Sequence, residues 1–136
     1  FWRQQEVKNY KYINYKKALE LHDPKKLKIK YQEMISSYLN QVKILNNYVT
    51  KSNATAIFIN QVLFDGIKNE RLFIINHSLI KYCKDQNLHC IDLASKFNGK
   101  IDYWYDSTHT TGLGSKAISE VVIEDLIKII KQEKMF

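Results

Sequence analysis

The sequence predicts a parallel α/β fold, and three observations support this prediction. Two short and almost wholly apolar segments, 54–61 and 88–93, have the composition of buried strands. Segment 70–85 between them carries apolar residues at helical spacing, and further amphipathic helices precede and follow the pair. Strands joined through a helix pair in parallel. Because a two-stranded parallel sheet is not stable alone, we expect further strands upstream of this sequence.

The first 29 residues differ from the rest of the chain in composition. We divide the protein into a basic, Tyr- and Lys-rich N-terminal segment, 1–29, and a larger domain, 30–136. The N-terminal segment contains a break at Asp23-Pro24. Its tyrosines and lysines have the spacing to stack on single-stranded bases, but we favour an arm or amphipathic helix that packs its tyrosines on a larger body.

Three amphipathic helices are predicted in the larger part of the chain. The first runs from Leu27 to about Thr50, the second covers 70–85, and the third covers 116–131. The predicted order is therefore helix, strand, helix, strand, a long loop at 94–115, and a last helix. The apolar stripe of the first helix needs a sheet or another helix to cover it.

The charge of the chain is unevenly distributed. Residues 1–51 contain eleven Lys or Arg and four acidic residues, whereas 52–136 contain ten of each. Nineteen of the 21 basic residues are lysines. Because arginine is the side chain that binds phosphates and bases through paired hydrogen bonds, a chain with few arginines is poorly suited to recognise them. We interpret the net charge of +7 as a solvated face and do not expect nucleic acid as a partner. The longest apolar runs are too short to span a membrane.

The chain has two cysteines, Cys83 and Cys90. Their spacing does not suit a zinc site. We favour two buried thiols, and a single local disulfide is the alternative.

The predicted loop 94–115 is the best candidate for a site. Sites in parallel sheets form at the carboxyl ends of strands, and long loops are usually functional. Asp106 and His109 lie three residues apart in this loop. A carboxylate at that spacing can accept the Nδ1 proton of the imidazole, which leaves Nε2 free to take a proton from a hydroxyl. An aspartate helix cap beside an exposed histidine, or a metal site, would have the same spacing.

The residues around this pair resemble a known family. Residues 90–93, 103–111 and Gly114-Ser115 are similar to the C-terminal block of SGNH/GDSL hydrolases. In that family an Asp-x-x-His pair, commonly followed by Thr and Gly, ends the catalytic domain. Upstream, 57–61 resembles the family's penultimate strand and its exit, and Asn76 falls in a helix where members often have Asn.

The resemblance implies both a fold and an activity. The fold would be the three-layer α/β/α SGNH (flavodoxin-like) fold with a parallel sheet, of which residues 30–136 form the C-terminal part. The activity would be a serine-type hydrolase of ester bonds, namely an esterase, deacetylase or acyltransferase, without metal or cofactor. Asp106 would orient His109, and His109 would act as general base and then as acid on a small-molecule or glycan ester.

Two further residues are candidates for substrate binding. Gln61 follows the first strand and can face a pocket at its carboxyl end. Trp104 can line an acyl or sugar pocket beside His109, or it can anchor the loop to the core.

The family's nucleophile and oxyanion donors have no counterpart in the sequence. None of the eight serines follows Gly-Asp, and no Gly-x-Asn-Asp block is present. Since an acyl-transfer enzyme needs both parts, we expect the nucleophile to lie outside this chain, in a longer protein. The alternatives are a catalytically silent binding domain of the same fold and a basic nucleic-acid-binding module.

Overall fold

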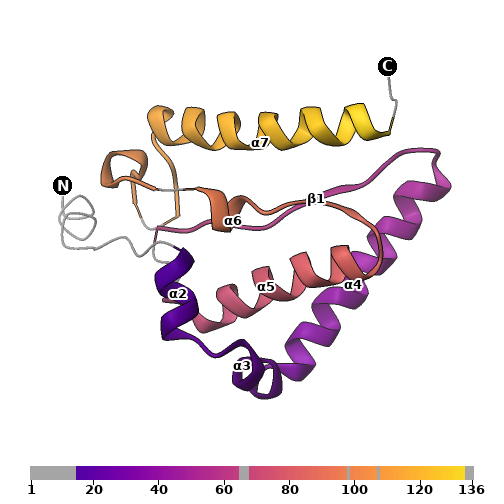
Figure 1. Cartoon of the computed structure of the whole chain (residues 1–136), viewed down its shortest axis with the longest axis horizontal. Helices are drawn as coiled ribbons and strands as arrows, with labels where there is room; N and C mark the ends of the chain where they lie inside the picture. The colour runs from indigo at the N-terminus through magenta and orange to yellow at the C-terminus, as the bar shows by residue number, and fades with distance from the viewer. Residues whose placement is uncertain (1–14, 65–67, 98, 107, 134–136) are drawn as a thin grey trace.

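The computed structural model describes residues 15–64, 68–97, 99–106 and 108–133 (Figure 1). Predictions that concern residues 1–14 and Ser107 lie outside the described residues. The elements, in chain order, are α2 (Tyr15–Leu21), α3 (Pro24–Lys30), α4 (Gln32–Lys51), β1 (Ile57–Ile59), α5 (Glu70–Asp85), β2 (His89–Ile91), α6 (Leu93–Lys96), the 3-10 helix η1 (Ile101–Tyr103) and α7 (Gly112–Gln132).

The structure is mainly helical, and the predicted fold class is wrong. Helices account for 68% of the described residues and strands for 7%, with a single two-stranded sheet. This is not a three-layer α/β/α SGNH fold. The physical reason is that the apolar surface of this chain lies on long helices, which pack mostly on one another, while each strand has three residues.

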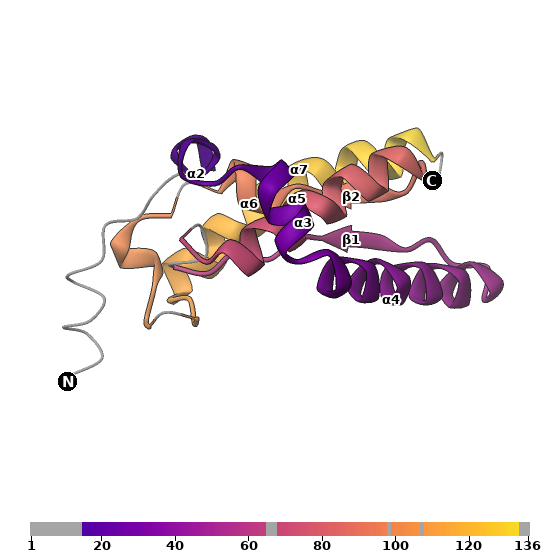
Figure 2. The same ribbon diagram turned by 90° about the horizontal axis from the view of Figure 1, so that it is seen from below.

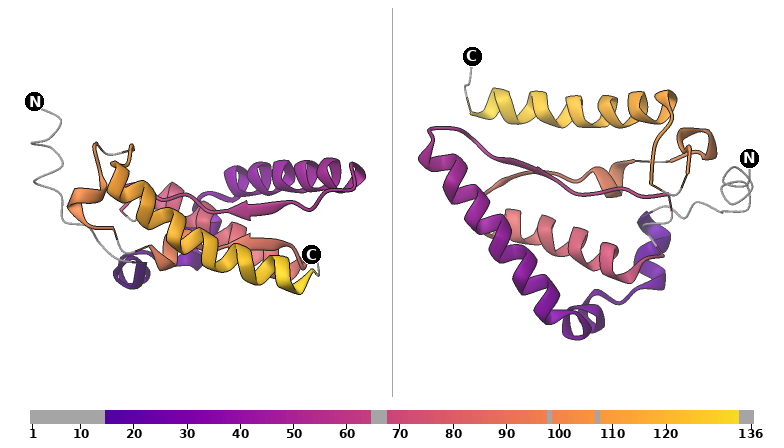
Figure 3. Two further views of the ribbon diagram at one scale, coloured as in Figure 1. Left: turned by 90° about the horizontal axis from the view of Figure 1, so that it is seen from above. Right: turned by 180° about the vertical axis from the view of Figure 1, so that it is seen from behind.

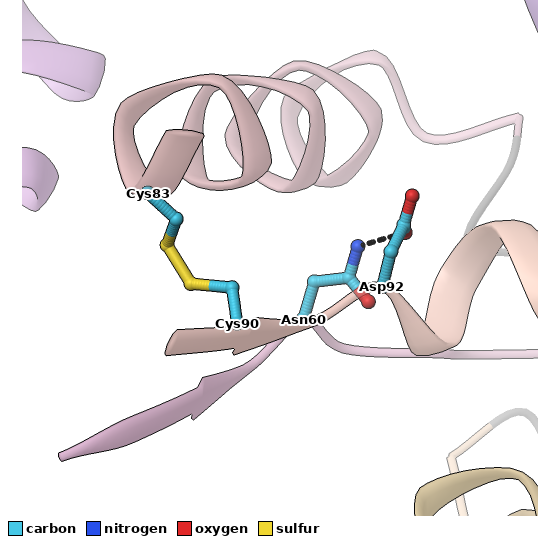
Figure 4. Close-up of a disulfide and its surroundings, with 4 residues drawn as sticks. All are labelled: Asn60, Cys83, Cys90 and Asp92. Atoms are coloured by element: carbon cyan, nitrogen blue, oxygen red, sulfur yellow. Dashed lines mark hydrogen bonds between the residues drawn. A yellow bond between two sulfur atoms is a disulfide. The ribbon is translucent and has the colours of Figure 1, made fainter. Parts of the chain in front are cut away.

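The two strands pair in parallel, as their connection through α5 predicts. Ile57 pairs with His89, and Ile59 pairs with Ile91. Both strands are shorter than predicted. Beyond β1 the N–H of Asn60 still donates to the carbonyl of Ile91 at 3.3 Å, and from there the Asn60 side chain makes the bonds to the second segment. Asn60 Oδ1 accepts from the backbone N–H of Ala94 at 2.8 Å, and Asn60 Nδ2 donates to Asp92 at 2.7 Å (Figure 4). The first strand is also not buried, since Ile59 is 44% exposed.

Side-chain caps explain where the helices begin. Asp23 accepts from the backbone N–H of Lys25 at 2.9 Å, so the Asp23-Pro24 break starts α3 with proline in its first turn. The first predicted helix is two helices that meet at Tyr31, where α4 begins without a side-chain cap. Asn69 caps α5 in the same way, accepting from Arg71 at 3.1 Å. The predicted bounds of this helix are confirmed.

The helices lie on both sides of the strands. Figure 1 shows α7 on one side and α5 on the other, and from behind α4 crosses α5 obliquely (Figure 3). In the view from below, α4 lies on the β1 side and α5 on the β2 side (Figure 2). One apolar cluster under α7 contains Phe64, Leu93, Phe97 and Trp104, and a second joins the N-terminal helices to α5 through Ala18, Leu27, Ile35, Phe73 and Ile74.

A disulfide joins the end of α5 to β2. Cys83 and Cys90 are bonded across a Cα–Cα distance of 6.1 Å (Figure 4). The favoured interpretation of two thiols is therefore wrong, and the alternative of one local disulfide holds. Cys83 is 2% exposed and packs with Val42 and Leu79, so the bond is part of the core between α4 and α5.

Candidate active site

Asp106 and His109 meet in the loop between η1 and α7. Nδ1 of His109 lies 2.8 Å from Oδ2 of Asp106 and 3.0 Å from its Oδ1. An ionised carboxylate can only accept, so Nδ1 is the donor and carries the proton. The backbone N–H groups of Thr108 and His109 also donate to Asp106 Oδ1, at 2.8 and 2.7 Å. These are the bonds of a turn closed by an aspartate side chain.

The donors around Asp106 keep its carboxyl group ionised. The hydrogen bond from the His109 side chain, followed by those from the backbone N–H groups of His109 and Thr108, lowers the pKa of Asp106 from 3.8 to about 2. Asp106 therefore carries a negative charge throughout the neutral range. A fixed carboxylate at Nδ1 orients the ring and fixes its tautomer.

The His109 ring is open on its other side. Its side chain is 75% exposed, whereas that of Asp106 is 17% exposed. Among the described residues, Nε2 of His109 has no hydrogen-bond partner, and the atom is free to meet a molecule from solution. The pair thus has an anchored end at Asp106 and an open end at Nε2 of His109.

Backbone hydrogen bonds hold the turn that carries the pair. The N–H of Tyr105 donates to the carbonyl of His109 at 2.8 Å, and Trp104 and Thr110 form an antiparallel bridge. The N–H of Thr111 donates to the carbonyl of Tyr103 at 2.9 Å. The long loop predicted over 94–115 therefore contains a short, hydrogen-bonded hairpin, together with α6 and η1.

Thr111 and Gly114 join this hairpin to α7. Thr111 Oγ1 accepts from the N–H of Gly114 at 3.2 Å and donates to the carbonyl of Asp102 at 2.8 Å. A Cβ atom at Gly114 would overlap the carbonyl oxygen of Tyr103, so only glycine allows the helix to approach so closely. Because Thr111 caps the helix, α7 begins at Gly112, four residues before the predicted start.

Trp104 anchors the hairpin in the apolar cluster under α7. Its side chain is 4% exposed, and the ring centroids of Phe64 and Phe97 lie 5.8 and 6.2 Å from its own in edge-on arrangements. The indole Nε1 is buried and has no partner among the described residues. Of the two roles considered for Trp104, the anchor is the one that its burial supports, and substrate binding stays a prediction.

Gln61 is exposed, and a side chain of α5 forms two hydrogen bonds to its backbone. Asn76 Oδ1 accepts from the N–H of Gln61 at 3.1 Å, and Asn76 Nδ2 donates to its carbonyl at 2.7 Å. The side chain of Asn76 is thus a positioning element for the exit of β1, which sequence analysis did not assign. A buried asparagine on the apolar face of a helix is the signal that points to such a role. A role for Gln61 in substrate binding stays a prediction.

Two hydroxyl groups lie close to the pair in the sequence. Ser115 Oγ and Thr110 Oγ1 share a hydrogen bond of 2.8 Å at the start of α7. In the part of the chain that the structure describes, no three His, Cys, Asp or Glu side chains are arranged to hold a metal ion. None of the described helices has the length and apolarity required to cross a bilayer.

Comparison with known proteins found no match to this chain, whether among family models, curated proteins or solved structures. The likeness to SGNH/GDSL hydrolases therefore rests on the motif residues alone and remains a prediction.

Proposed function

We propose that Asp106 and His109 form the acid–base pair of an enzyme that hydrolyses esters or transfers their acyl groups. The observation that carries the proposal is the 2.8 Å hydrogen bond from His109 Nδ1 to Asp106, combined with an Nε2 atom that is open to solution. This is the arrangement by which a carboxylate fixes the tautomer of a catalytic imidazole.

In this mechanism a serine hydroxyl from outside the 136 residues is the nucleophile. Nε2 of His109 takes the hydroxyl proton while the oxygen attacks the ester carbonyl, and Asp106 stabilises the resulting imidazolium. The imidazolium then gives its proton to the leaving alcohol, and an acyl-enzyme remains. In the second half of the reaction water, or an acceptor alcohol in acyl transfer, attacks the acyl carbonyl and gives its proton to Nε2 of His109. The imidazolium then returns a proton to the serine oxygen, which leaves as the free hydroxyl.

The hydrogen bonds of the hairpin support this role. A general base must stay within hydrogen-bond reach of the proton that it takes. Here the His109 backbone is fixed by its bonds to Asp106 and Tyr105, while Trp104 anchors the strand opposite.

The test uses the natural gene product that contains these 136 residues and a short-chain aryl ester such as p-nitrophenyl acetate. Replacing His109 with Ala should lower kcat/KM by about a thousandfold or more, and Asp106→Asn should lower it by about a hundredfold or more. The matched control is His89→Ala. His89 is also a histidine paired with a carboxylate, at 3.0 Å from Glu133, but it lies outside the hairpin. Its replacement should change turnover by less than about threefold.

Two outcomes would contradict the proposal. One is turnover that is unchanged in His109→Ala, and the other is a natural product with no esterase activity and no serine that reacts with a fluorophosphonate. The second outcome would favour the silent binding domain. A nitrogen NMR spectrum of this chain also tests the tautomer, because the proton should reside on Nδ1 of His109 in the neutral ring.

A further inference from the structure

The chain contains two Asn-x-Ser/Thr tripeptides, the sequence pattern in which an asparagine side chain accepts an N-linked glycan. They are Asn53-Ala54-Thr55 and Asn76-His77-Ser78, and neither has proline in the middle. The pattern alone does not distinguish the two. Their surroundings do, because the first lies in an exposed turn and the second in α5, against the exit of β1.

The tripeptide on α5 is closed to modification. Asn76 is 6% exposed, and its side-chain amide makes hydrogen bonds to both the N–H and the carbonyl of Gln61. Ser78 is 2% exposed. A glycan on Nδ2 of Asn76 would need the space in which that atom meets the Gln61 carbonyl at 2.7 Å. The folded chain therefore excludes a glycan at Asn76.

The tripeptide after α4 is open. It lies in the turn between α4 and β1, and Asn53, Ala54 and Thr55 are all exposed. Asn53 has a φ of 54°, in the left-handed region that asparagine tolerates, and its backbone N–H donates to the carbonyl of Thr50 at 3.0 Å. The Asn53 amide and the Thr55 hydroxyl make no side-chain hydrogen bond to any described residue. Both groups of the acceptor pattern are therefore accessible to a transferase.

The disulfide between Cys83 and Cys90 points to the compartments in which such a transfer takes place. Disulfides persist in oxidising compartments and in secreted proteins, and proteins that carry glycans on Asn-x-Ser/Thr are found in the same places. This observation is independent of the turn, because the two cysteines lie on α5 and β2.

We propose that Asn53 carries an N-linked oligosaccharide. Nδ2 of Asn53 forms a bond to C1 of a sugar that is carried on a lipid diphosphate. The bond from C1 to the diphosphate oxygen breaks, the amide loses one proton to a base of the transferase, and the lipid diphosphate leaves. The hydroxyl of Thr55 is the second group that the acceptor pattern requires.

The proposed site is separate from the Asp106–His109 hairpin. Figures 1 and 2 show the turn between α4 and β1 at one end of the molecule and the hairpin at the other. A glycan at Asn53 therefore leaves Nε2 of His109 open, and the proposal does not depend on the esterase function.

The test maps the tryptic peptides of the protein isolated from its natural source, before and after digestion with a peptide N-glycosidase in heavy-oxygen water. Trypsin places the two tripeptides on separate peptides, 52–68 and 72–81, because a lysine or arginine precedes and ends each. We expect peptide 52–68 to carry the glycan and to contain a labelled aspartate at position 53 after digestion. Peptide 72–81 is the internal control and should be unmodified. A natural product whose peptide 52–68 is wholly unmodified, or whose peptide 72–81 carries a glycan, would overturn the proposal.

A matched pair of variants, produced in the natural host, tests the acceptor pattern. Thr55→Ala and Ser78→Ala each remove the hydroxyl from one tripeptide and keep its asparagine. Neither variant loses a side-chain hydrogen bond to a described residue. Thr55→Ala should abolish the glycan mass, whereas Ser78→Ala and the conservative variant Thr55→Ser should retain it. A glycan that persists in Thr55→Ala, or that disappears in Ser78→Ala, would show that Asn53 is not the modified residue.

Discussion

The helical layer formed by α3, α4 and α5 and the hairpin that carries Asp106 and His109 are held together by different forces. The helical layer depends on apolar packing around Phe73, Ile74 and Leu79 and on the disulfide. The hairpin is anchored at its base by Trp104, but its turn depends on directional hydrogen bonds between backbone groups and the side chains of Asp106 and Thr111. Packing supplies most of the stability of a domain, whereas directional bonds fix the position of individual atoms.

This difference separates the residues that determine the free energy of unfolding from those that determine the geometry of the Asp106–His109 pair. A substitution in the helical layer should change the free energy of unfolding and leave the geometry of the Asp106–His109 pair intact. A substitution in the hairpin should displace the pair at a smaller cost in stability. The following predictions test this separation, beginning with the largest expected effect.

Phe73→Ala should have the largest effect on stability. Phe73 is 2% exposed, and the rings of Tyr15, His22 and His77 surround it with centroids 5.8, 5.0 and 6.1 Å away. Its removal leaves a hole that the helices cannot fill, and the free energy of unfolding should fall by about 3–5 kcal/mol. Urea unfolding measures this change.

The control for Phe73 is Tyr48→Ala. Tyr48 lies on α4 and is 74% exposed, so its replacement should change stability by less than about 0.5 kcal/mol. In both variants the proton should remain on Nδ1 of His109. Loss of that signal in folded Phe73→Ala protein would show that the two regions are not separate.

Gly114→Ala should disturb the hairpin more than it disturbs the whole fold. The added Cβ would overlap the Tyr103 carbonyl, so the hairpin must move away from α7, at a cost of about 1–3 kcal/mol. Gly112→Ala is the matched control, because a Cβ there meets nothing within 4 Å. It should be neutral or stabilise the helix by about 0.5 kcal/mol. If both alanine variants have the same free energy of unfolding, the close contact of Gly114 with the Tyr103 carbonyl does not restrict this position to glycine.

The smallest expected effect is on the titration of Asp106. Its pKa of about 2 in the folded chain lies below the ordinary 3.8, so the contribution of this carboxylate to stability is complete above about pH 4. That contribution is lost as the pH falls from about 4 towards 2. In His109→Ala the pKa should rise but remain below 3.8, since the N–H donors of Thr108 and residue 109 persist. Carboxyl carbon shifts measure both values, and an unchanged pKa in the variant would contradict the role of His109.

The sequence predicted local elements better than the fold class. The bounds of α5 follow from its apolar spacing between Asn69 and Gln86, and the parallel pairing follows from its position between two apolar segments. The early start of α7 was missed because Gly112 and Gly114 are typical of loops, whereas here the Thr111 cap includes them in the helix. The three-layer fold was inferred from a motif, and a motif constrains a hairpin rather than the number of strands.

The contacts of the candidate site residues also differ in how far the sequence could predict them. Asp106 and His109 are three residues apart, so their meeting depends on one turn that spacing can suggest. The clasp of Gln61 by Asn76 joins the exit of β1 to α5, and only the packing of that helix on the strands brings the two residues together. Periodicity places each residue on a helix face, but it does not specify which faces meet.

The disulfide changes the effect of proteolysis between α5 and β2. Cys83 and Cys90 enclose the last residues of α5, which include the exposed Lys84, and the turn that leads to β2. A trypsin cut after Lys84 would break the backbone, but the two fragments would remain one covalent molecule until a reductant was added. On a non-reducing gel the nicked protein would migrate as a single species, and α5 would stay attached to β2.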